Sequence, residues 1–131
     1  MINTAELVLL FSPDPLYAAR AGEAFAALGI AVRAVASGEV TQAVGFLADF
    51  PGQSPSPKPL VPPPLLEPMM VLVGFSRERI DALFDTMRAH GAPPCDRKAI
   101  LTPTNAGWTF HALYEELGRE HEATHRKKGG K

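Results

Sequence analysis

The sequence lacks the features that mark secreted and membrane-spanning proteins. It has one cysteine in 131 residues, Cys95, and a single cysteine cannot form a disulfide within the chain. Its longest apolar run, residues 69–75, is far shorter than the ~20 residues that a membrane-spanning helix needs. The opening residues have no basic stretch followed by an apolar region, as a secretory signal would. These absences predict a cytoplasmic protein without a membrane anchor.

The sequence also lacks a large surplus of charge, with 14 acidic and 13 basic residues. The last six residues, 126–131, hold four of the bases and no acid, so residues 1–125 are net acidic. A nucleic-acid-binding protein normally carries its basic face on the folded body. We therefore predict that nucleic acid is not the partner and that residues 126–131 form a basic, disordered tail.

Two stretches with the same order of patterns are separated by a proline-rich segment. Residues 7–12 (LVLLFS) and 71–76 (VLVGFS) both end in Phe-Ser, and each precedes a helical pattern, a second apolar run and another helical pattern. Residues 51–68 contain eight of the 13 prolines, which excludes a helix interior or a central strand. We predict an internal duplication, with β-α-β-α repeats at 1–50 and 69–125 joined by a linker at 51–68.

The apolar patterns predict the α/β class, with one four-stranded sheet and helices packed on it. Residues 7–11 and 69–75 are apolar almost throughout, as in central strands that are covered on both faces. The runs at 30–35 and 98–101 include or begin with a charged residue, as edge strands do. The pattern leaves open whether the sheet is ferredoxin-like or an open α/β arrangement.

The helical patterns predict which side chains are buried. Apolar residues at positions 0, 3, 4 and 7 of a helix lie on one face. In the second half these are Ile80, Leu83, Phe84 and Met87, and then Phe110, Leu113, Tyr114 and Leu117. In the first half the predicted buried stripe is Leu16, Ala21, Phe25 and Leu28, and the shorter element after it carries Val40, Val44 and Leu47.

The second half resembles a known family in three short segments. These are residues 71–76 (VLVGFS), residues 98–105 (KAILTPTN) and the helical stretch after Trp108. Over about residues 69–122 the chain resembles an uncharacterised family of small bacterial domains, found mostly in anaerobic bacteria and described as a domain of unknown function. The resemblance implies a domain there, and it implies no reaction.

The candidate ligand site lies between the fourth strand and the last helix. Helix N-termini favour anions, and in open α/β sheets ligands bind beyond the carboxyl ends of strands. The candidate ligand-binding residues are Thr102, Thr104, Asn105, Trp108 and, from the strand, Lys98. The alternative is structural: Asn105 or Thr109 caps the helix, and Lys98 is a solvated lysine of an edge strand.

Other reactive residues form no recognisable catalytic or metal-binding motif. Cys95 lies in a turn without a base that the sequence identifies. His121 and His125 are four residues apart, but only one cysteine is available to complete a zinc site. We therefore expect no bound metal, no cofactor and no catalytic residue.

The sequence thus predicts a non-catalytic binding or regulatory module that recognises a small anionic ligand or a protein partner. Its exposed edge strands make a homodimer a candidate assembly. The alternative is an enzyme that acts on a small phosphorylated or carboxylated substrate at residues 102–109, with Cys95 or His111 as the reactive group.

Overall fold

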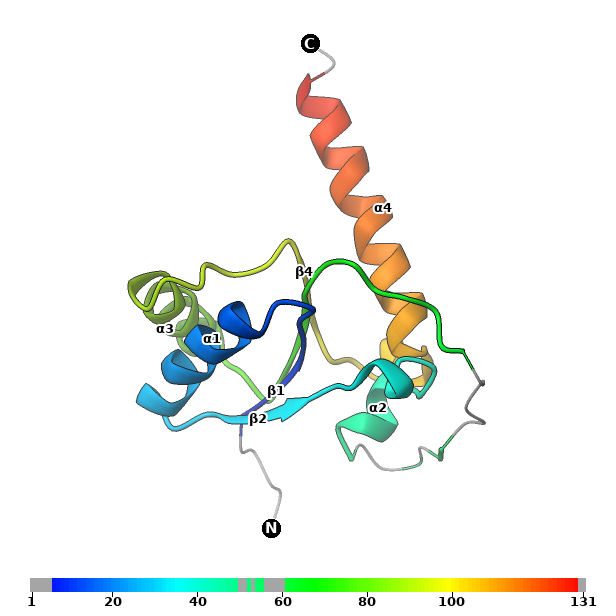
Figure 1. The fold of residues 1–131 in the computed structure, drawn as a ribbon, viewed down its shortest axis with the longest axis horizontal. Helices are drawn as coiled ribbons and strands as arrows, with labels where there is room; N and C mark the ends of the chain where they lie inside the picture. The colour runs from blue at the N-terminus through cyan, green and yellow to red at the C-terminus, as the bar shows by residue number, and fades with distance from the viewer. Residues whose placement is uncertain (1–5, 50–51, 53, 56–60, 130–131) are drawn as a thin grey trace.

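The computed structural model describes residues 6–49, 52, 54–55 and 61–129, with side chains described as far as residue 120 (Figure 1). In the first half the elements are β1 (Leu7–Phe11), α1 (Pro15–Ala27), β2 (Ala31–Ala34), the 3-10 turn η1 (Ser37–Glu39) and α2 (Val44–Leu47). In the second half they are β3 (Met69–Val73), α3 (Arg77–Ala89), β4 (Arg97–Ile100), the 3-10 turn η2 (Asn105–Gly107) and α4 (Phe110–Gly129).

The four strands form one mixed sheet in the order β2-β1-β3-β4. β1 pairs parallel with β2, β3 pairs parallel with β4, and β1 and β3 pair antiparallel with Leu9 opposite Val71. Two parallel β-α-β units therefore meet at an antiparallel centre, so the sheet is an open α/β arrangement and not a ferredoxin-like one. The prediction of an α/β protein with apolar central strands is confirmed.

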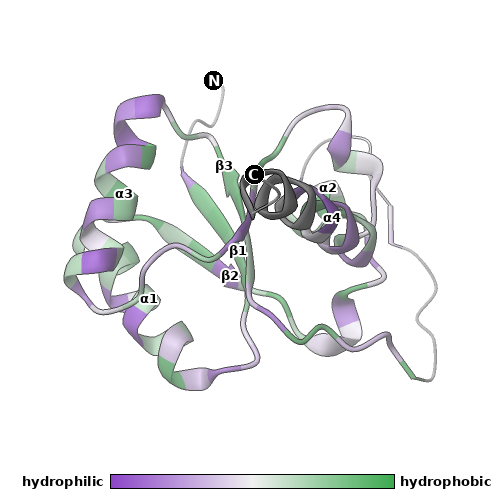
Figure 2. Ribbon diagram, turned by 90° about the horizontal axis from the view of Figure 1, so that it is seen from above, coloured by the Kyte–Doolittle hydropathy of each residue, from purple (hydrophilic) through white to green (hydrophobic). Residues whose placement is uncertain are grey.

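Helices cover both faces of the sheet, as Figure 2 shows from above. Val8 and Leu10 of β1 face the layer of α1 and α3, whereas Leu9 and Phe11 face the layer of α2 and α4. These four side chains are all buried. Because successive residues of a strand point to opposite faces, a central strand between two helical layers must be apolar at every position.

Local capping explains where the two long helices of the first layer begin. The Asp14 carboxylate accepts the N–H of Leu16 at 2.9 Å, and Pro15 follows at the first helical position. The Ser76 hydroxyl accepts the N–H of Arg79 at 3.2 Å. Both helices have 13 residues. The halves differ at their ends, because α2 has four residues and α4 has 20; their origin by duplication stays a prediction.

One predicted core position is wrong. Leu16 is 57% exposed, and Tyr17 packs in its place against the core that contains Ala21 and Phe25. Residue 17 is four positions before Ala21 and so lies on the same face of the helix, whereas residue 16 lies about 140° away around the axis. The helical period therefore decides which residue is buried, and it selects Tyr17 although Leu16 is the more apolar of the two.

The end of the proline-rich segment packs against the body. Leu65 is buried in the core between the sheet and α4, whereas Val61 and Leu66 are exposed. The Tyr114 hydroxyl of α4 accepts the N–H of Leu66 at 3.2 Å and that of Glu67 at 3.0 Å. α4 ends at Gly129, beyond the predicted end of the repeat at residue 125, and the side chains of the predicted tail lie outside the described residues. Among the described residues, no helix is long and apolar enough to cross a membrane.

Candidate functional site

The predicted loop after β4 is held together by its own polar side chains. The Asn105 amide oxygen accepts the N–H of Thr102 at 2.9 Å, and the Thr102 hydroxyl accepts the N–H of Asn105 at 3.1 Å. The Asn105 amide nitrogen also donates to the carbonyl of Ile100 at 3.0 Å. Two of the residues that were expected to hold an anion, Thr102 and Asn105, are therefore engaged in fixing the turn between β4 and α4.

The N-terminus of α4 is also occupied by the protein itself. The N–H of Phe110 donates to the carbonyl of Gln42 at 2.9 Å, and that of His111 donates to Val40 at 2.8 Å. A third N–H, at Ala112, donates to the Thr109 hydroxyl at 3.0 Å, which makes Thr109 the cap. An anion at a helix N-terminus needs free N–H groups. The geometry thus favours the structural role for this loop.

The remaining predicted residues do not join that loop in one site. Lys98 lies on the face of β4 that looks toward α3, and its ammonium donates to the Cys95 carbonyl at 3.2 Å. The loop packs with α2, in the layer on the other face of the sheet. Thr104 is exposed, and Trp108 is 39% exposed with its carbonyl accepting the N–H of Val44 at 2.7 Å.

The proposed reactive groups are also separated. Cys95 is buried in the core under α1 and α3, where its thiol donates to the carbonyl of Arg97 at 3.2 Å. Burial raises the pKa of this thiol, so it remains protonated at neutral pH and is a weak nucleophile. His111 belongs to α4 on the opposite face, where its ring lies 3.5 Å from the carboxylate of Glu115. The two cannot act as a nucleophile and its base.

A neighbouring tyrosine reinforces the structural character of this cysteine region. The Tyr17 hydroxyl donates to the carbonyl of Pro93 at 2.7 Å, which ties α1 to the loop before β4. Burial, together with the adjacent Cys95, raises the pKa of the Tyr17 hydroxyl well above its usual range. Among the described side chains, no three His, Cys, Asp or Glu residues lie close enough to hold a metal ion. The side chains of His121 and His125 are outside the described part of the chain.

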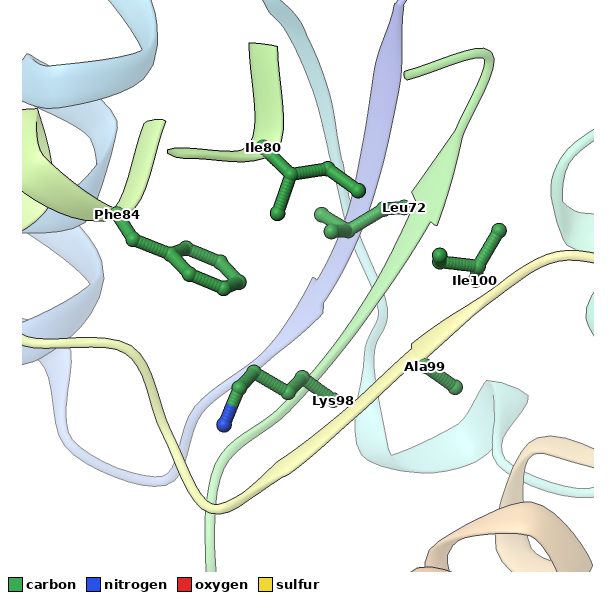
Figure 3. A pocket seen from close by; sticks show the side chains of 6 residues that line it. All are labelled: Leu72, Ile80, Phe84, Lys98, Ala99 and Ile100. Carbon is green, nitrogen blue, oxygen red and sulfur yellow. The ribbon is translucent and has the colours of Figure 1, made fainter. Parts of the chain in front are cut away.

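A hollow lies between α3 and β4 (Figure 3). Its volume is about 300 Å³, and the residues that line it are Leu72, Ile80, Phe84, Lys98, Ala99 and Ile100. A second hollow of about 390 Å³ shares Ile80 and Ile100 and extends toward Phe75, Arg77 and Asp81. We call these two hollows together the α3/β4 groove.

The groove exists because the helical layer does not extend over the edge of the sheet. α1 and α3 pack against each other over the central strands. β4 lies at the edge of the sheet beside them, and Ile80 and Phe84 of α3 face it across the hollow (Figure 3). Ile80 and Phe84 are therefore only partly buried, and Ile100 is 51% exposed. A concave apolar surface beside a few polar groups is the usual form of a binding site.

The backbone of β4 is open along the same edge. The N–H of Leu101 donates to the carbonyl of Leu72 at 2.9 Å, and bonding in a parallel ladder alternates between residues. The backbone groups of Lys98 and Ile100 consequently point away from β3. Asn105 occupies the carbonyl of Ile100. Within the part of the chain that the structure describes, the outward groups left for a partner are therefore both backbone groups of Lys98 and the N–H of Ile100.

Sequence reasoning missed the groove although it named several of its residues. Ile80 and Phe84 were predicted to be buried, and Lys98 was assigned to an anion at the loop. The available signal was Ile100, which stands two residues from Lys98 and thus on the same side of a strand predicted to be at the edge.

Comparison with known proteins places all of these lining residues in one domain. No curated protein and no solved structure matches the chain. A family model does match, over residues 68–124. This range contains β3, α3, β4, η2 and most of α4. This match confirms the resemblance predicted over residues 69–122. Residues 68–124, part of the chain, thus match the model of the family described as Domain of unknown function (DUF3783).

Proposed function

We propose that this protein is a non-catalytic binding module that holds an extended segment of a protein partner along β4. The observation that carries the proposal is the apolar α3/β4 groove, which lies directly beside the open edge of this strand. The segment adds a fifth strand to the sheet, and its side chains on the α3 side enter the groove.

This mode of recognition uses two features together. Both backbone groups of Lys98 and the N–H of Ile100 bond to the main chain of the added segment, which contributes affinity for any sequence. The groove then selects apolar side chains at every second position of the segment. Burial of Ile100, which is 51% exposed in the free protein, removes apolar surface from water and stabilises the complex.

A protein segment fits this geometry better than the other candidates do. The N–H groups that would bind a small anion at α4 are engaged within the protein. In the enzymatic alternative the reactive group is Cys95 or His111; Cys95 is buried on the face of the sheet opposite the loop after β4, and the His111 ring lies 3.5 Å from the Glu115 carboxylate. A second copy of the chain is the competing occupant of β4. We also propose a cytoplasmic location, which is supported by a buried free cysteine.

Selection of binding peptides tests the proposal with a matched pair of variants. Random heptapeptides displayed on phage are selected on the wild-type protein, and the enriched peptides are titrated into Ile100→Asp and Val32→Asp. Val32 is the control because it is 46% exposed on β2, the edge strand at the other end of the sheet. We expect tenfold or greater loss of affinity for Ile100→Asp and little change for Val32→Asp, with both variants folded by circular dichroism.

Three results would overturn the proposal. One is the absence of any enriched peptide, and another is a larger loss for Val32→Asp than for Ile100→Asp. The third is a wild-type dimer, measured by sedimentation, that becomes a monomer in Ile100→Asp, because a second copy would then occupy the edge.

A further inference from the structure

The α3/β4 groove has the positively charged Lys98 at one end. Lys98 has three N–H donors; one of them bonds to the carbonyl of Cys95 at 3.2 Å, and the ammonium lies 5.8 Å from the ring centre of Phe84 (Figure 3). Among the described residues, no ion pair within 4.0 Å includes Lys98. The ammonium therefore has donors left for a group that arrives in the groove.

The opposite end of the groove is electrically balanced. Arg77 and Asp81 both line it, one basic and one acidic. Between the two ends the lining is apolar, with Leu72, Ile80 and Phe84 as its main side chains. The groove thus offers an apolar middle and a net positive charge only at Lys98, and the complementary occupant is apolar with one negative group.

Strand geometry fixes how far apart these two features of the occupant lie. Lys98 and Ile100 are two residues apart on β4, and their side chains both face α3. Side chains of an added strand recur on that face at every second residue as well. Directly opposed residues on neighbouring strands interact, and opposite charges there are favourable. The residue facing Lys98 and the residue facing Ile100 are therefore also two positions apart.

We propose that the bound segment carries an acidic residue opposite Lys98 and an apolar residue two positions away, opposite Ile100. This inference rests on the proposed function. The apolar residue precedes the acidic one if the segment runs antiparallel to β4 and follows it if the segment runs parallel. The partner is thus an extended peptide in which one residue of any type separates an apolar residue from an acidic one, in either order.

The proposal is tested with two capped heptapeptides, acetyl-Ser-Thr-Ile-Thr-Glu-Thr-Ser-amide and acetyl-Ser-Thr-Glu-Thr-Ile-Thr-Ser-amide. Each is compared with the peptide that has Gln in place of Glu, by titration into the 15N-labelled protein. We expect one Glu peptide to bind about threefold more tightly than its Gln counterpart, as for an exposed ion pair. The preference disappears at 1 M salt and in Lys98→Met, which keeps a flexible apolar stem over Phe84, and it returns in Lys98→Arg.

The outcomes separate this inference from the proposed function. If the Glu and Gln peptides bind equally to the wild type and both lose affinity in Ile100→Asp, the edge binds segments without reading charge, and the acidic signature is refuted alone. If the preference for Glu survives in Lys98→Met, a different cation reads it and the inference is also refuted. If no peptide binds the wild type or perturbs β4, both proposals fail.

Discussion

Replacing Asn105 with alanine removes the two side-chain hydrogen bonds that fix the turn between β4 and α4. Asn105 accepts from Thr102 N–H at 2.9 Å and donates to the Ile100 carbonyl at 3.0 Å. Each such bond contributes about 0.5–1.5 kcal/mol net, and water replaces part of both in this loop. We therefore expect Asn105→Ala to lower the free energy of unfolding by about 1–2 kcal/mol.

Thr104 provides the matched control for this substitution. It is exposed, and its side chain caps no helix, so Thr104→Ala should stay within about 0.5 kcal/mol of the wild type. Urea unfolding followed by circular dichroism measures both, and heating should lower the midpoint of Asn105→Ala by roughly 4–8 °C. Equal stability of the two variants would refute the structural role that we assign to Asn105, and so would a loss in Thr104→Ala alone.

Two further predictions concern a pair of helical glycines and an ion pair. Gly22→Ala should stabilise the protein by about 1 kcal/mol, because a Cβ there meets nothing within 4 Å and alanine favours helix. Gly118→Ala should instead destabilise the protein by roughly 1 kcal/mol, since the alanine Cβ would displace the Arg97 guanidinium from the face of Tyr114. Thermal unfolding of both variants measures these changes, and a higher midpoint for Gly118→Ala than for the wild type would contradict the prediction. A bidentate hydrogen bond from the Arg79 guanidinium lowers the pKa of Glu6 from 4.5. Because the pKa of Glu6 is lower in the folded state, the ion pair with Arg79 stabilises the folded protein fully above pH 4.5. This stabilisation is lost as the pH falls through the pKa of Glu6 in the folded state. The gap in urea midpoint between wild type and Glu6→Gln should therefore be present at pH 7 and shrink below pH 4.5, whereas a gap that is constant with pH would exclude this linkage.

Much of the fold follows from short-range patterns in the sequence. The continuous apolar runs identified the two central strands, because only a strand covered on both faces needs apolar residues at every position. Arg33 and Lys98 marked the edge strands, since a charge can reach water from the edge. Asp14 with Pro15 and Ser76 marked helix starts, because capping involves only residues two or three positions apart.

The candidate site could not be predicted in the same way. Thr102 and Asn105 are the residue types that bind anions, but the same groups bond to each other, and a sequence does not show which partner they choose. The groove is lined by residues of two separate elements, α3 and β4. It forms only because of how far the helical layer extends over the sheet, which local sequence patterns do not show. Leu16 illustrates the same limit on a smaller scale, because its exposure follows from the rotational setting of α1 on the sheet.

Hydrogen exchange of single backbone amides shows whether a bound segment pairs with the edge of β4. In the free protein the N–H groups of Lys98 and Ile100 face outward from β4, as those of Val32 and Ala34 do from β2, where the N–H of Val35 bonds inward to Leu10 at 2.9 Å. With the tighter of the two heptapeptides bound, we predict slower exchange at Lys98 and Ile100 and unchanged exchange at Val32 and Ala34. Slower exchange confined to β2, or to residues 102–109, would show that the peptide binds elsewhere and would refute binding along β4.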